Sequence, residues 1–255
     1  MVENVESYIL PVHLTSFDIG ATRKMKYSMI LRLLQEAAGR HLEELGLSYS
    51  VLREQYGMVF LLVEAAVRIH RLPAYGETVD AETWFCGVEG VKFGRGLRIC
   101  SGDELCIELG SHWVLVDPDT HRIVRPSKFP VPEGMQTTSD GPMPVPLEKQ
   151  RSGLLFSSEG EPVPGVCRAG KRVVRYSDLD SNGHVNNAVY VDMLCDFFPD
   201  GFSGHAFSGF KIDFLGEAKE QETIGIRARR QGNTVFFEGQ VETRPCFVAS
   251  ATVVE

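Results

Sequence analysis

KRVVRYSDLDSNGHVNNAVYVDMLCDFF, residues 171–198, contains a strand-like start, a polar turn and an apolar helical segment in direct succession. The apolar residues after the turn recur at helical spacing, and Pro199 and Gly201 supply the stop signal. These apolar positions are Val189, Tyr190, Met193, Leu194, Phe197 and Phe198. The segment therefore predicts a strand, a tight polar loop and a buried helix.

A second copy of this pattern occupies residues 12–45, VHLTSFDIGATRKMKYSMILRLLQEAAGRHLEEL. Its apolar residues again follow a helical period over residues 28–45, with Ser28 as a plausible N-cap and Gly46 as the stop. The chain is thus predicted to contain one supersecondary unit twice, which changes the expected fold of the whole molecule.

Each predicted helix is followed by β-rich stretches separated by turn residues. The stretches are residues 61–70, 77–87, 94–100 and 105–117 in the first half, and 207–214, 222–230, 233–243 and 246–254 in the second. A buried helix followed by four or five antiparallel strands predicts a curved sheet packed around the helix, which is an α+β architecture.

Eight of the 13 prolines fall within residues 126–165, where neither a helical nor a strand period persists. We therefore expect two domains, residues 1–125 and 166–255, joined by a Pro/Gly/Ser-rich linker over 126–165. The 255 residues, 43% of them hydrophobic and 24% charged, are sufficient for real cores and exclude disorder over most of the chain.

Composition also limits the location and the partners. No apolar stretch approaches the roughly 20 residues that cross a bilayer, and the start MVENVESYILPVH lacks the basic and apolar regions of a secretory signal. We therefore expect a cytoplasmic protein. Its thiols should be reduced, because the six cysteines include no CxxC pair.

The net charge of −8 disfavours nucleic acid as a binding partner. Local clusters such as Lys92/Arg95/Arg98 are either docking patches for an acidic partner or solvated strand edges.

Aligning the two copies at Asp18 and Asp178 shows that polar residues gather only in the second. The alignment sets Gly20 against Asp180, Thr22 against Asn182 and Lys24 against His184. A second alignment, of Val79 with Ile224 in the later strands, sets Leu72 against Glu217. If the copies share a fold, the chemistry belongs to the second half, and the first has become a binding or structural half.

Three interpretations of the loop at residues 178–187, DLDSNGHVNN, are open. The plainest is a turn with Asx and N-cap hydrogen bonds. A calcium loop of the EF-hand type is disfavoured, because Val189 stands where the bidentate carboxylate belongs. The third is a catalytic site at a helix N-terminus, where backbone N–H groups stabilise an oxyanion and a carboxylate takes a proton from water.

The sequence resembles the acyl-acyl carrier protein thioesterases, a family with two tandem hotdog folds in one chain, over roughly residues 8–250. The matching segments are FDIGATR (17–23), LPAYGETVDAETW (72–84), GSHWVLVDPDTHRIVRPSKFP (110–130), YSDLDSNGHVNNAVYVD (176–192) and KIDFLGEA (211–218). The resemblance implies two antiparallel sheets, each wrapped around a long central helix, with the first helix lining the acyl tunnel. It implies a catalytic group of Asp180, Asn182, His184 and Glu217, and an acyl carrier protein bearing a phosphopantetheine-linked acyl chain as the partner.

One departure from the family affects the mechanism. Some members carry a Cys directly after the catalytic Glu, where this chain has Ala218, so a Cys–His nucleophile at that position is excluded. We expect Cys195 to pack in the core. Hydrolysis by an activated water follows, with Asp180 or Glu217 as the general base, Asn182 orienting the water or the carbonyl, and His184 positioning or protonating the leaving sulfur.

Several alternatives remain. An acyl-CoA thioesterase would use the same chemistry, a catalytically silent acyl-binding module would use the polar loop only to cap its helix, and a hotdog dehydratase would pair a His with a carboxylate. The histidines have no metal-site spacing such as HExxH, so neither a metal nor an organic cofactor is expected. Since sheets of tandem hotdog folds can pair further, a homodimer is also compatible with the sequence.

Overall fold

The computed structural model describes residues 7–130, 142–150, 155–156, 168–199 and 201–254. The chain divides into two compact units, residues 1–147 and 148–255. The predicted linker, residues 126–165, lies for most of its length outside the described residues.

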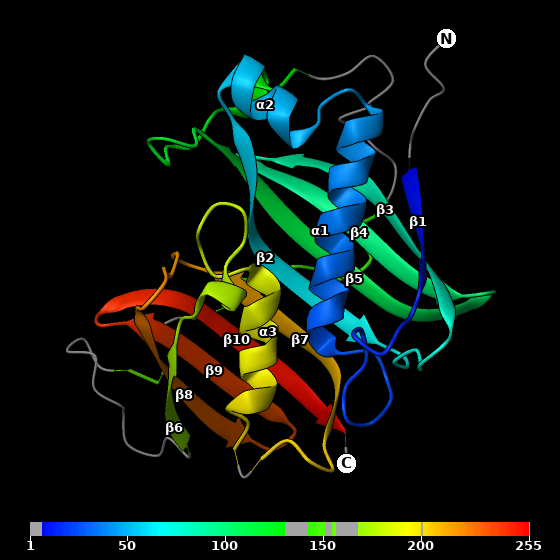
Figure 1. Cartoon of the computed structure of the whole chain (residues 1–255), viewed down its shortest axis with the longest axis vertical. Helices are drawn as coiled ribbons and strands as arrows, with labels where there is room; N and C mark the ends of the chain where they lie inside the picture. Colours follow the sequence, from blue (N-terminus) through cyan, green and yellow to red (C-terminus); the bar gives the residue numbers. More distant parts are fainter. Residues whose placement is uncertain (1–6, 131–141, 151–154, 157–167, 200, 255) are drawn as a thin grey trace. The chain divides into compact units, whose positions relative to one another are not determined.

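Within its described residues, the first unit contains an antiparallel sheet with the strand order β1-β3-β4-β5-β2. The elements are β1 (Ser7–His13), α1 (Tyr27–Glu44), α2 (Tyr49–Tyr56), β2 (Val59–Ile69), β3 (Thr78–Glu89), β4 (Lys92–Ser101), β5 (Glu104–Val116) and the 3-10 helix η1 (Pro126–Lys128). Helix α1 runs across one face of this curved sheet (Figure 1).

Burial explains why α1 forms where the periodicity predicts it. Its buried side chains include Ile30, Leu31, Leu34, Ala37 and Ala38, one apolar face of the helix. Burial of each Ile or Leu side chain among them contributes about 1.5–3 kcal/mol. The helix begins at Tyr27 after Lys26, which makes no side-chain cap, so the prediction of Ser28 as the N-cap was wrong. Gly46 follows the helix with φ of 75°, as expected of a stop residue.

The second unit repeats the plan with a shorter helix. Its sheet has the order β7-β10-β9-β8-β6 and is antiparallel throughout its described strands. The elements are β6 (Arg168–Val173), the 3-10 helix η2 (Tyr176–Asp178), α3 (Asn187–Asp196), β7 (Ala206–Phe214), β8 (Thr223–Gln231), β9 (Thr234–Val241) and β10 (Arg244–Val254). Helix α3 crosses one face of this sheet (Figure 1). The α+β prediction of two tandem hotdog folds is therefore confirmed.

Matching hydrogen bonds confirm the alignment of the two copies. Three pairs of backbone bonds correspond: Lys26 N–H to Asp18 O (2.9 Å) with Asn186 N–H to Asp178 O (2.9 Å), Gly20 N–H to Lys24 O (2.9 Å) with Asp180 N–H to His184 O (2.8 Å), and Met25 N–H to Pro73 O (2.7 Å) with Val185 N–H to Ala218 O (2.9 Å). The loop before each helix is thus held in the same way in both units, although the side chains differ.

In each unit, a glutamate carboxylate stabilises the segment that accepts the last of these bonds, around Pro73 in the first unit and Ala218 in the second. In the first, Glu77 accepts from the Ala74 N–H at 2.6 Å, from Arg71 at 2.9 and 3.1 Å, and from Ser101 Oγ at 2.7 Å. The hydrogen bonds from Arg71 hold the pKa of Glu77 at about 2. Because that pKa is depressed in the folded state, the stabilisation is complete above the pKa of the unfolded chain and is lost as the pH falls toward 2.

We predict that Glu77→Gln lowers the free energy of unfolding of the first unit by about 1–2 kcal/mol at pH 7. The difference from wild type should shrink steadily as the pH falls from about 4, where Glu77 of the unfolded chain begins to protonate, toward 2, where the folded carboxylate protonates as well. Urea unfolding followed by tryptophan fluorescence measures it, since both tryptophans, Trp84 and Trp113, lie in the first unit. The exposed Glu54, changed to Gln, is the control; a loss that does not vary with pH would contradict the prediction.

Candidate active site

The polar loop between β6 and α3 begins at a buried carboxylate. Asp178 is 5% exposed, and its two oxygens bind different donors. Oδ1 accepts from Arg172 Nη2 at 2.6 Å, and Oδ2 accepts from the Arg175 N–H at 2.9 Å. A buried carboxylate needs such partners because burying it unpaired is very costly. Asp178 therefore fixes the end of β6 to the start of the loop.

Asp180 shapes the next turn through its side chain. Its Oδ1 accepts from the Asn182 N–H at 2.8 Å and from the His184 N–H at 3.3 Å. Between them Gly183 has φ of 78°, a left-handed conformation that favours glycine. The turn brings the chain back so that Val185 is buried and His184 lies at the bridge to Lys219.

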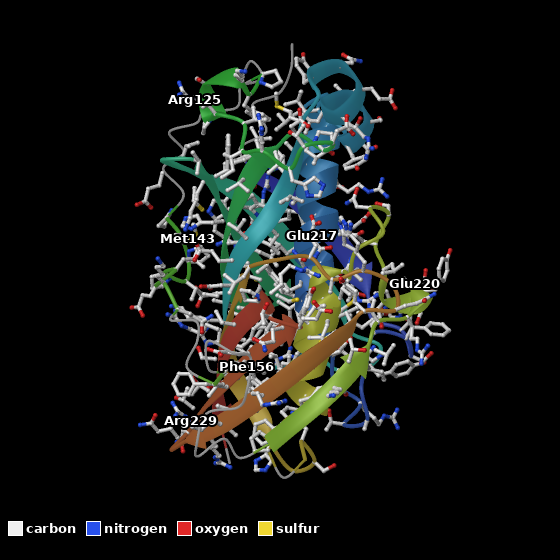
Figure 2. The ribbon with its side chains drawn as sticks, turned by 90° about the vertical axis from the view of Figure 1, so that its left-hand side faces the viewer. Arg125, Met143, Phe156, Glu217, Glu220 and Arg229 are labelled. Carbon is white, nitrogen blue, oxygen red and sulfur yellow. The ribbon has the colours of Figure 1, made fainter. Side chains whose placement is uncertain are left out.

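Glu217 lies in the loop that follows β7, not on a strand. The loop is anchored on β10 by the N–H groups of Leu215 and Gly216, which both donate to Cys246 O. At Gly216 a Cβ would come within 2.7 Å of Pro245 O, so the close approach requires glycine. Figure 2 labels Glu217 and, further along the same loop, the exposed Glu220.

An arginine from β10 fixes the same loop from its other side. Arg244 donates to the Glu217 carbonyl oxygen and pairs with Glu222 at 2.8 and 3.0 Å. Glu222 in turn accepts from the Lys219 N–H at 2.7 Å, the counterpart of Glu77 in the first unit. Arg244 was not predicted from the sequence, because its partners lie more than 20 residues away and no local motif links them. The repeat alignment with Glu77 was the available signal for Glu222.

The two loops bring His184 and Glu217 together. His184 Nε2 and Glu217 Oε2 are 3.1 Å apart, with side chains 18% and 32% exposed. They are near enough to share a proton and accessible enough to meet a small molecule. Of the four predicted site residues, the structure thus joins His184 to Glu217 by their side chains.

Asp180 joins the group through the backbone of the turn, since its carboxylate binds the N–H groups of Asn182 and His184. Asn182 is an exposed residue at the tip of that turn. In the first unit the corresponding residues are Gly20, Thr22, Lys24 and Leu72. The first unit therefore keeps the loop geometry without the imidazole and carboxylate pair.

Two backbone N–H groups at the start of α3 are already hydrogen-bonded and are not available to an oxyanion. Asn186 caps the helix by accepting from the Ala188 N–H at 2.9 Å, and the Val189 N–H donates to Asn186 O at 2.9 Å. These two donors are satisfied within the helix cap.

The five described cysteines offer no activated nucleophile near the pair. Cys195 on α3 is half-buried, and burial raises the pKa of its thiol; Ala218, which follows Glu217, is fully buried. All five cysteines within the described residues are free thiols, and Cys167 lies outside them.

Across the described residues, no three His, Cys, Asp or Glu side chains are grouped to hold a metal ion. No described helix is long and apolar enough to span a membrane.

Fold and site together define a two-unit hotdog protein with a His–carboxylate pair in its second unit. Family models identify the family: the acyl-ACP thioesterase N-terminal domain matches residues 6–128, and the acyl-ACP thioesterase C-terminal domain matches residues 169–244. The chain belongs to the acyl-ACP thioesterase family.

Curated relatives and solved structures agree with this family. Oleoyl-acyl carrier protein thioesterase 2 of Arabidopsis thaliana is 24% identical over 88% of this chain and 63% of its own length. Dodecanoyl-[acyl-carrier-protein] hydrolase of Cinnamomum camphora is 26% identical over 79% of this chain and 54% of its own. The chain thus spans somewhat more than half the length of these relatives.

Two solved structures share the fold. An acyl-ACP thioesterase from Bacteroides thetaiotaomicron matches with a TM-score of 0.82 at 18% identity, covering 100% of both chains. The 12:0-ACP thioesterase from Umbellularia californica matches with a TM-score of 0.76 at 17% identity, over 98% of this chain and 95% of that one.

The repeat supplies a matched pair of variants that tests how the polar loop is held. Asp178 uses both oxygens on separate donors, whereas Asp18 binds the Thr15 N–H and Oγ1 through Oδ2 alone. An asparagine retains one acceptor oxygen, so it replaces Asp18 better than Asp178.

We predict that Asp178→Asn lowers the free energy of unfolding of the second unit by about 2–3 kcal/mol, and that Asp18→Asn costs the first unit less than about 1 kcal/mol. Urea titration followed by far-UV circular dichroism, with tryptophan fluorescence to isolate the first unit, measures both. Equal losses in the two variants would show that the second carboxylate oxygen of Asp178 does not stabilise the loop.

Proposed function

We propose that this protein hydrolyses the thioester bond between an acyl chain and acyl carrier protein and releases a free fatty acid. The observation that carries the proposal is the contact between His184 and Glu217, formed by two loops whose counterparts in the first unit carry Lys24 and Leu72. Family membership and the names of the relatives, which are acyl carrier protein thioesterases and hydrolases, support the substrate class.

In the proposed reaction, water attacks the thioester carbonyl without an enzyme-bound acyl intermediate. Glu217 accepts a proton as the water oxygen bonds to the carbonyl carbon, and His184 holds this carboxylate in place. The carbon–sulfur bond then breaks, and the thiolate leaves and takes the proton back through His184. A thiol with a pKa of about 8.5 is a good leaving group that needs little acid assistance.

Asp180 and Asn182 have supporting roles in this proposal. Because one oxygen of Asp180 already accepts two backbone N–H groups, we assign it to positioning His184, and we assign the base to Glu217. Asn182, at the tip of the same turn, orients the water or the carbonyl group. The apolar face of α1 in the first unit holds the acyl chain.

We predict that His184→Ala and Glu217→Gln each reduce kcat at least about a hundredfold, while the protein remains folded. The measurement is thiol release from acyl carrier protein thioesters, with circular dichroism as the folding check. Glu220→Gln, an exposed change in the same loop, is the control and should keep wild-type activity. Near wild-type turnover in either site variant would remove that residue from the mechanism.

The proposed carrier-protein partner predicts a dependence on ionic strength. Lys171, Arg175 and Lys219 are exposed around the polar loop, and such cations attract an acidic carrier protein over distances that salt shortens. We expect KM for acyl carrier protein substrates to rise with salt while kcat stays constant. The same acyl group on pantetheine alone is the control, and a KM that is flat for the carrier-protein substrates would exclude electrostatic docking.

A further inference from the structure

A layer of buried polar side chains crosses the interior of the first unit. Four elements each contribute one residue, all nearly or fully excluded from solvent: His41 from α1 (1% exposed), Thr83 from β3 (0%), Arg95 from β4 (3%) and Ser111 from β5 (0%). Arg95 pairs in register with Phe85 on β3 and with Ser111 on β5. Arg95 was predicted to lie in an exposed cluster with Lys92 and Arg98, and this prediction was wrong because its side chain is buried.

Apolar residues lie on both sides of this layer along every element. The side toward the start of α1 contains Ile30, Leu31, Leu34, Ala37, Ala38, Val79, Ala81, Leu97, Ile99, Ile107 and Leu109. The other side is a packed cluster that includes Leu45, Leu47, Leu52, Phe85, Phe93, Leu115 and Phe129. An apolar ligand lying along α1 from its start would therefore meet the polar layer at Arg95.

Arg95 is held firmly but is not fully paired. Its Nη1 donates to His41 Nδ1 at 3.2 Å and to Thr83 Oγ1 at 3.1 Å, and its guanidinium stacks 4.1 Å from the centre of the Phe85 ring. Its Nη2 is buried without a hydrogen-bond acceptor among the described residues. No described carboxylate contributes to the electrostatics of Arg95, whose pKa is affected by burial and by the Cys86 thiol.

This arrangement is energetically unusual. A buried cation ordinarily pairs with an anion, because desolvation is otherwise uncompensated. Burial lowers the pKa of Arg95 to about 9, so the guanidinium remains charged at neutral pH. An oxygen acceptor from outside the described chain would satisfy the Nη2 donors. The apolar residues on both sides of Arg95 favour a hydrocarbon chain as the rest of such a ligand.

We propose that Arg95, held by His41 and Thr83, is a specificity residue that receives an oxygen-bearing group at the far end of an acyl chain bound along α1. The inference rests on the proposed acyl thioester substrate and adds a preference within that class. Chains that reach Arg95 with a terminal carboxylate or hydroxyl satisfy the Nη2 donors. Plain alkyl chains of the same length leave those donors unpaired and are disfavoured.

The test compares thioesters of plain, ω-hydroxy and ω-carboxy acyl chains, matched in length over a series of increasing chain length. At lengths that reach Arg95, wild type should show kcat/KM at least about tenfold higher for an oxygenated chain than for the plain one. Arg95→Met, which keeps an unbranched side chain without the donors, should abolish this preference. Arg98→Met is the matched control, since Arg98 lies on the same strand but is exposed and pairs with Glu82.

A binding measurement keeps the inference separate from the proposed hydrolysis. Free fatty acids and their ω-oxygenated analogues are titrated against the full chain, with tryptophan fluorescence as the readout. Both tryptophans lie in the first unit, and Trp113 Nε1 donates to Ser111 in the polar layer. The binding preference should follow the same order even if no thioester is cleaved. If Arg95→Met does not fold, Thr83→Val, which removes one of the groups that hold Arg95, should weaken the preference instead.

Two results would overturn the assignment. The first is equal binding and turnover of plain and oxygenated chains by wild type at every length. The second is an unchanged preference in the folded Arg95→Met variant. Faster turnover of longer plain chains by Arg95→Met, without any wild-type preference for oxygen, would make Arg95 only a steric wall.

Discussion

The hydrogen bond from the Val185 N–H to Ala218 O is the contact on which the candidate site depends. It joins the loop before α3 to the loop after β7, and both residues are buried. His184 and Glu217 are the residues directly before these two, so this bond places them side by side. Met25 and Pro73 form the same bond in the first unit, where no such pair exists. The scaffold is thus common to both units, and the side chains carried on it decide which one holds the site.

Much of this arrangement could be predicted from the sequence, because the relevant signals are local or periodic. The helical spacing predicted α1 to within one residue at each end. The alignment of Asp18 with Asp178 set Lys24 against His184, and the alignment of Val79 with Ile224 set Leu72 against Glu217. Matched backbone bonds in the two units confirm both alignments. The catalytic roles of the four site residues stay predictions, since contacts alone do not show which group moves a proton.

Other features could not be predicted because they depend on distant partners. Helix α2 has only Leu52 buried, so its apolar period is too weak to detect. Arg244 on β10 donates a hydrogen bond to the carbonyl oxygen of Glu217, which lies 27 residues earlier in the sequence. Arg95 looked like part of a surface cluster, although strand alternation places it on the same face as Phe93 and Leu97, which are both buried.

Buried charges elsewhere in the chain show why Arg95 is distinctive. Asp178 is buried against Arg172, and Glu64, which is 6% exposed, contacts Lys92 and lies 2.8 Å from His112. In both cases the chain supplies an opposite charge or a titratable partner, as desolvation requires. Arg95 alone among these three has neutral neighbours, a stacked ring and two donors without acceptors within the described residues. Arg95 is thus a buried cation without an opposite charge among the described residues, and the apolar side chains on both sides of it fit the proposed ligand, a hydrocarbon chain with a polar end.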